Sequence, residues 1–211
     1  MGLVHAFVLT MLIATLGELS GAHFNPAVTI ALATLRKVAW STVPGYIAAQ
    51  VAGAVVAALV VKFALTAPAD ATSYGATSVN EKFLAGDGAA ALAELIGTFA
   101  LMWAIIGMAV NPRGERAWAP LVIGSTLGLA VMAIGPLSGA GLNPARAFGP
   151  ALVGGAYGGA GMFLLVYVAA PVAGALLAAL GYRALTAERD AVTAHVRRQI
   201  DEIDRPATAV D

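Results

Sequence analysis

Two short stretches decide the fold: Ser-Gly-Ala-His-Phe-Asn-Pro-Ala at residues 20–27 and Ser-Gly-Ala-Gly-Leu-Asn-Pro-Ala at residues 138–145. In both, Asn followed by Pro marks a helix start, because an Asn side chain caps free backbone N–H groups and Pro suits the first helical position. The apolar pieces that follow, 26–35 and 144–153, have about ten residues each, and crossing a bilayer takes about 20. The sequence therefore predicts two half-membrane helices that enter the bilayer and stop.

A second pair of matching stretches indicates an internal duplication. Residues 46–59 and 167–180 are identical at 10 of 14 positions, with an offset of 121, close to the offset of 118 between the Asn-Pro-Ala stretches. Three full spans are expected between the two motifs. Because three is odd, the half-helices enter from opposite faces. Such an inverted repeat places a site at the membrane midplane, where the two halves meet.

The composition places the repeats in a membrane. Of 211 residues, 59% are hydrophobic and 11% are charged, whereas soluble domains carry roughly a quarter charged residues. This argues against a soluble enzyme and a disordered protein, and a net charge of zero offers nothing to nucleic acid. Five apolar segments are each near the length of a span: residues 1–19, 40–63, 89–110, 118–137 and 160–183.

The expected organisation is a membrane domain over residues 1–183 and a charged tail over 184–211. The first repeat covers 1–63 and the second covers 88–183. The second begins with an extra span that carries Glu94, 49 residues before Asn143. The same step back from Asn25 falls before residue 1, so the first repeat lacks its first span. The fold class is an all-α membrane protein with five full spans and two half-helices.

Basic residues give the expected orientation. The links after residues 35 and 110, together with the tail, hold nine Lys and Arg residues, and the opposite side holds Lys62 and Lys82. The positive-inside rule puts the first side in the cytoplasm. The N-terminus is then outside a plasma membrane and the tail is inside. The spacing of Val192, Val196 and Ile200 would suit a short amphipathic helix, but we expect a solvated tail.

The midplane chemistry follows from the motif residues. Each half-helix start carries partial positive charge, and the side-chain amides of Asn25 and Asn143 can each donate to a passing water. Pro26 and Pro144 stiffen the turns. A water held by two donors points its hydrogens away from the centre, which interrupts proton transfer while the water passes. Arg146, three residues after Asn143, is costly in a membrane and is therefore a functional candidate.

These residues resemble the aquaporin (major intrinsic protein) family. The resemblance covers residues 1 to about 183 and is carried by the sequences around the two Asn-Pro-Ala triplets, Asn25, Pro26, Ala27 and Asn143, Pro144, Ala145. It implies a passive water channel rather than an enzyme, assembled as a homotetramer in the lipid bilayer, with no cofactor and no metal. The family has six full spans, and this chain has five.

The resemblance also implies an outer constriction. Carried over by offset, it consists of His5, Val131, Ala140 and Arg146. Strict water channels of the family have an aromatic residue and a His at the first two places, so we expect a wider opening that also passes ammonia, urea or hydrogen peroxide. Ala147 stands where glycerol-conducting relatives have Asp, which makes glycerol a less favoured solute.

Three further polar residues are expected to support the pore. The resemblance gives Glu94 the role of accepting hydrogen bonds from a half-helix loop, and a buried carboxylate needs such partners. Glu18 either lines the cytoplasmic mouth or binds the loop backbone. Gln50 is expected to stabilise packing, on a helix whose small residues recur every four positions and suit close helix contact.

The missing span leaves alternatives open. The sequence could start upstream of Met1, be a truncated and non-conducting relic, or be a genuine five-span variant completed by oligomer contacts. A secondary transporter built on inverted repeats is the nearest other class, although it would need ionisable residues at the midplane. An intramembrane enzyme would rest on Glu18, His23 and Glu94, which form no known catalytic pattern.

Overall fold

The computed structural model describes residues 1–65 and 72–203, with side chains through Thr186 and for Val196. Five helical segments are long and apolar enough to cross a membrane, which confirms the five predicted spans to within a few residues. They are Gly2–Ser20, Trp40–Ala64, Asp87–Val110, Arg116–Ser138 and Ala160–Thr186.

The first four spans consist of helices α1 (Gly2–Ser20), α3 (Val43–Ala64), α5 (Asp87–Ile105) and α6 (Ala119–Ser138). Short turns flank three of them. The 3-10 turns η1 (Trp40–Thr42) and η4 (Arg116–Trp118) lead into α3 and α6, and the π-helical turn η3 (Ile106–Val110) ends α5. The fifth span begins with α8 (Ala160–Phe163) and the π-helical turn η5 (Leu164–Ala169) and continues into α9 (Ala170–Ile203).

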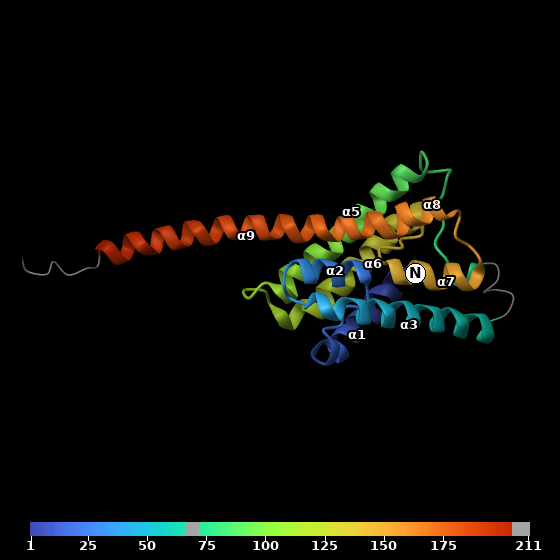
Figure 1. Cartoon of the computed structure of the whole chain (residues 1–211), viewed down its shortest axis with the longest axis horizontal. Coiled ribbons are helices and arrows are strands. Elements are labelled where there is room, and N and C mark those ends of the chain that lie inside the picture. Colours follow the sequence, from blue (N-terminus) through green and yellow to red (C-terminus); the bar gives the residue numbers. More distant parts are fainter. Residues whose placement is uncertain (66–71, 204–211) are drawn as a thin grey trace, which may run out of the picture.

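Two short helices start at the Asn-Pro-Ala motifs, as expected. They are α2 (Pro26–Thr34) with 9 residues and α7 (Pro144–Gly154) with 11. At 1.5 Å per residue they are about 14 and 17 Å long, roughly half of the hydrocarbon core. Both lie among the longer helices in Figure 1, with α2 and α7 on opposite sides of the centre. The chain thus has the predicted all-α architecture.

Each half-helix packs on the last span of the other repeat. Helix α2 lies against α9, and α7 lies against α3. Small side chains make these contacts close: a Cβ added at Gly149 of α7 would come within 2.5 Å of the carbonyl oxygen of Ala54 on α3. In the other half, Ala31 of α2 is fully buried in one cluster with Ala175 and Ala178 of α9. The two repeats therefore interlock.

The tail, which we expected to be a solvated segment, is helical as far as Ile203. Helix α9 continues without a break from the fifth span to Ile203 and extends beyond the rest of the bundle in Figure 1. Neither Gly nor Pro occurs between Tyr182 and Arg205, so nothing in the local sequence stops the helix. Residues 204–211 of the predicted tail lie outside the described residues.

Candidate functional site

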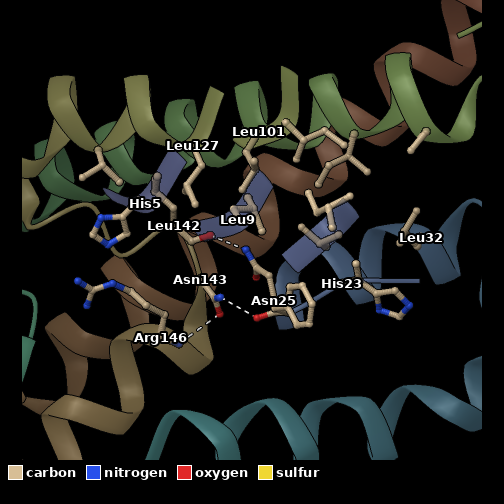
Figure 2. A pocket seen from close by; sticks show the side chains of 18 of the residues that line it. His5, Leu9, His23, Asn25, Leu32, Leu101, Leu127, Leu142, Asn143 and Arg146 are labelled. Carbon is tan, nitrogen blue, oxygen red and sulfur yellow. Dashed lines mark hydrogen bonds between the residues drawn. The ribbon is translucent and has the colours of Figure 1, made fainter. Parts of the chain in front are cut away.

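The two half-helices meet through a reciprocal pair of hydrogen bonds. The side-chain Nδ2 of Asn25 donates to the carbonyl of Leu142 at 2.8 Å, and Nδ2 of Asn143 donates to the carbonyl of Phe24 at 2.9 Å. Figure 2 shows Asn25 and Asn143 side by side, with dashed lines for these bonds. Each motif therefore uses its Asn to hold the backbone of the other motif.

The same two side chains also cap their own helices. Oδ1 of Asn25 accepts from the backbone N–H of Ala27 at 2.9 Å. Oδ1 of Asn143 accepts from the N–H groups of Ala145 and Arg146 at 3.0 and 3.2 Å. An amide NH2 has two donors, and one donor of each Asn is taken by the opposite loop. One N–H per Asn is left for a molecule beside it.

A cavity of about 140 Å³ runs past both Asn side chains. Its walls are mostly apolar, with contributions from α1, α5 and α6. Figure 2 shows His5 and Arg146 at one end, and His23 and Leu32 at the other. This arrangement gives a narrow apolar passage with its polar groups at the centre and near the ends.

All four residues expected at the constriction line this cavity: His5, Val131, Ala140 and Arg146. Val131 and Ala140 are buried, while His5 and Arg146 are half-buried. Nη1 of Arg146 donates to the carbonyl of Gly75 at 3.0 Å, and Nδ1 of His5 lies 3.1 Å from the carbonyl of Met1. The structure thus brings the four residues around one passage.

Glu94 holds the loop of the second motif. Its side chain is fully buried. Oε1 accepts from the Ser138 hydroxyl at 2.6 Å and the Gly141 N–H at 2.7 Å, and Oε2 accepts from the Leu142 N–H at 2.5 Å. The left-handed backbone at Ala140 (φ 48°) and Leu142 (φ 51°) belongs to the loop that brings these N–H groups to one carboxylate.

The first motif has no such carboxylate. Nε2 of Gln50 donates to the carbonyl of His23 and, at 2.9 Å, to Oγ1 of Thr29. The backbone N–H groups of His23 and Phe24 correspond to those of Gly141 and Leu142. Within the part of the chain that the structure describes, neither is the donor in a hydrogen bond. Gln50 contacts the loop, but it holds a carbonyl and leaves these donors unpaired.

Glu18 is placed differently from both roles considered for it. It lies in the last turn of α1, is exposed, and is not among the residues that line the cavity. Its side chain makes no hydrogen bond within the described ranges 1–65 and 72–203. Its neighbour Leu19 is also exposed, so this part of the α1 surface faces away from the motif loop.

Sequence reasoning missed a symmetric pair of tyrosine hydroxyl contacts. The Tyr46 hydroxyl donates to the Ser20 carbonyl at 3.0 Å, and the Tyr167 hydroxyl donates to the Ser138 carbonyl at 2.7 Å. The alignment of 46–59 with 167–180 contained the signal, because both stretches begin with Tyr. The contact between the Gly75 carbonyl and Arg146 could not be predicted from the sequence, because every residue has a backbone carbonyl and no residue type identifies the one that accepts.

A groove of about 900 Å³ lies between α1 and α3, and we call it the α1–α3 groove. Its lining includes Leu12, Gln50, Gly53, Ala57, Asn143 and Arg146. His5, His23, Phe24, Asn143 and Arg146 line both the cavity and this groove. The passage is therefore bordered by an open groove on the side of the first repeat.

The repeat alignment shows how that groove differs from the matching place in the second repeat. Gly174 of α9 is aligned with Gly53 of α3. A Cβ at Gly174 would lie 3.0 Å from the backbone carbon of Leu95, because α5 packs directly on it. A Cβ at Gly53 would meet nothing within 4 Å among the described residues. The groove thus occupies the place that α5 fills in the other half.

Comparison with known proteins gives consistent matches. The family model for the major intrinsic protein matches residues 1–182. The aquaporin NIP3-1 of Arabidopsis thaliana is 37% identical over 95% of this chain and 61% of its own length. The aquaporin AqpM of Methanothermobacter thermautotrophicus is 40% identical over 89% of this chain and 76% of its own. Nodulin-26 of Glycine max is 41% identical over 85% of this chain and 63% of its own.

The fold comparison agrees with these matches. The X-ray structure of the aquaglyceroporin from Plasmodium falciparum superposes with a TM-score of 0.67 and 26% identity, covering 84% of this chain and 78% of that one. The chain spans 61% of the length of the Arabidopsis relative. The family match, the interlocked half-helices and the shared fold together lead to one conclusion: this chain belongs to the major intrinsic protein family and has an aquaporin-like helical membrane fold.

Proposed function

We propose that the chain forms a passive membrane channel for water that also admits small neutral solutes such as ammonia, urea and hydrogen peroxide, with glycerol less favoured. The observation that carries this proposal is the pair Asn25 and Asn143 beside one narrow apolar passage. Each keeps one N–H donor for a passing water. An apolar wall without further partners lets that water leave as easily as it arrives.

Exclusion of ions and protons has three sources in this arrangement. The positive ends of α2 and α7 meet at the Asn pair, and they repel a cation at the centre. A water that accepts from both Asn side chains directs its own hydrogens outward, so a chain of waters cannot pass a proton through it. Arg146 adds a fixed positive charge at the constriction.

The proposed constriction explains the solute range. Val131 and Ala140 are small apolar side chains that line the passage, and His5 and Arg146 supply polar groups. Two small residues leave more room than larger ones would, which favours solutes somewhat larger than water. Urea and ammonia can also accept from, or donate to, the polar pair.

The test is osmotic shrinkage of liposomes that contain chain 1–211, followed by stopped-flow light scattering. We expect shrinkage faster than in empty liposomes. Val131→Trp, which fills the passage, should abolish the excess rate, while Leu129→Trp should keep it, because Leu129 lies on the same helix and is 63% exposed. Equal rates in these two matched variants would contradict a route through this cavity.

The α1–α3 groove favours a second candidate, a chain that does not conduct by itself. Because the groove borders His5, Asn143 and Arg146, the passage lacks a wall there. In liposomes, folded chain 1–211 would then give no excess shrinkage. An apolar helix patterned on residues 87–110, including a Glu at the position of Glu94, can be fused upstream of Met1. If the open groove is what prevents conduction, this fusion should restore it. If the fold cannot conduct for another reason, the fusion should leave the shrinkage rate unchanged.

We also propose insertion in the plasma membrane as a homotetramer, with the N-terminus outside and the tail in the cytoplasm. The distribution of basic residues supports this orientation. The sequence contains no Cys, so single variants Lys82→Cys and Lys37→Cys report the two faces without background. An impermeant maleimide added to whole cells should label only Lys82→Cys. The mass of the complex, measured by light scattering, tests the tetramer.

A further inference from the structure

A turn beside the constriction has an unusual backbone. Ser73, Tyr74 and Gly75 (η2, Ser73–Gly75) have φ values of 45°, 57° and 88°. Residues other than glycine rarely adopt this left-handed region, and they keep it only where surrounding contacts hold them. Two of these three residues have side chains, so the turn needs such contacts.

Those contacts come from two helices. Nζ of Lys62, in the last turn of α3, lies 5.3 Å from the centre of the Tyr74 ring. At the end of α7, a Cβ added at Gly154 would come 3.0 Å from the carbonyl oxygen of Ser73, so turn and helix are in close contact.

The turn directs one group at the passage. The carbonyl oxygen of Gly75 accepts from Nη1 of Arg146 at 3.0 Å. Arg146 is half-buried and lines both the cavity and the α1–α3 groove. Figure 2 shows its side chain at the same end of the cavity as His5. The conformation of the turn therefore bears on where the guanidinium lies.

We propose that Tyr74 and Lys62 are positioning residues for the constriction, and this inference rests on the proposed channel function. Lys62 holds the Tyr74 ring by a cation–π contact, and the ring keeps the turn left-handed. The turn then presents the Gly75 carbonyl, which fastens Arg146 to the wall. Once released, the guanidinium reaches into the passage and obstructs a larger solute more than it obstructs water.

The experiment compares urea with water permeability in the same liposomes, because this ratio does not depend on the fraction of active protein. An exposed cation–π contact shifts an equilibrium by roughly two- to five-fold. Lys62→Met and Tyr74→Ala should lower the urea-to-water ratio by about that factor. Tyr74→Phe retains the ring and should leave the ratio unchanged. Lys82→Met should also leave it unchanged, because it changes an exposed lysine elsewhere in the segment between α3 and α5.

A second measurement separates failure of this inference from failure of the channel proposal. The N–H of Gly75 bonds to Thr72 and that of Ala76 to Ser73, at 2.9 and 3.1 Å. Hydrogen exchange at these two amides should be faster in Lys62→Met than in Lys82→Met, even if the chain carries no flux. An unchanged or higher permeability ratio in conducting Lys62→Met, or unchanged exchange in a non-conducting chain, would overturn the proposal.

Discussion

The two repeats hold the same Asn-Pro-Ala loop by different means. In the second repeat, a fully buried Glu94 on α5 accepts three hydrogen bonds, and a fully buried Tyr167 adds a fourth contact. In the first, half-buried Gln50 and Tyr46 contact the loop from α3, and the α1–α3 groove lies open beside them. The same motif is therefore held by more, and more deeply buried, contacts in the second repeat than in the first.

The spans of the first repeat are also less buried than those of the second. In an 18-residue apolar stretch of the spans of α1 and α3, 11% and 6% of the residues are buried, against 39% for the span of α5 and 50% for the fifth span. Because buried contacts fix a loop more firmly than exposed ones, we expect perturbations of the second repeat to cost more than matched perturbations of the first.

The largest expected effect comes from the two loop supports. Glu94→Leu leaves two backbone N–H groups and the Ser138 hydroxyl unpaired in a buried site, at about 1–3 kcal/mol each, so the free energy of unfolding should fall by roughly 3–9 kcal/mol. Gln50→Leu should cost only about 1 kcal/mol, since the Oε1 of Gln50 is itself buried without a partner. Unfolding in mixed detergent, followed by tryptophan fluorescence, measures both. Similar losses would remove the contrast between the repeats.

The next largest effect on stability is expected where the half-helices pack on the spans, α7 on α3 and α2 on α9. Gly149 on α7 is aligned with Ala31 on α2. Gly149→Ala forces a methyl group against the backbone of Ala54 and should destabilise the protein by about 1–3 kcal/mol. Ala31→Gly removes a methyl group without a clash, and it should cost about 1 kcal/mol through helix propensity. The thermal unfolding midpoints of the two variants, measured in one detergent, show which substitution destabilises the protein more. A lower midpoint for Ala31→Gly than for Gly149→Ala would contradict this prediction.

The smallest effect concerns the paired tyrosine hydroxyls. Tyr167→Phe leaves the Ser138 carbonyl unpaired in a fully buried place and should cost about 1–2 kcal/mol. Tyr46→Phe changes a half-buried bond, and it should cost about 0.5 kcal/mol or less because the Ser20 carbonyl is nearer to solvent or lipid headgroups. The same unfolding assay applies, and equal costs would mean that burial does not set the strength of these bonds.

Much of the fold could be predicted because it depends on local chemistry. Asn25-Pro26 and Asn143-Pro144 specify helix starts, apolar length specifies spans, and the odd number of spans between the two motifs specifies the inversion of the repeats. The sequence left two alternatives open for the tail after α9 leaves the membrane, because charged residues suit both a solvated tail and an exposed helix. The surroundings of the Glu18 side chain could not be predicted, because the sequence does not reveal which face of α1 is turned to the loop.

The sequence by itself determined that this is a duplicated, inverted membrane protein with two Asn-Pro-Ala half-helices, since periodicity, caps and apolar length act within a few residues of each other. Only the tertiary structure decided which backbone groups the Asn pair holds, that Glu94 gathers three donors, and that Gly75 meets Arg146. These contacts join residues 44 to 119 positions apart in the chain. They exist only once helix packing has brought the two repeats together.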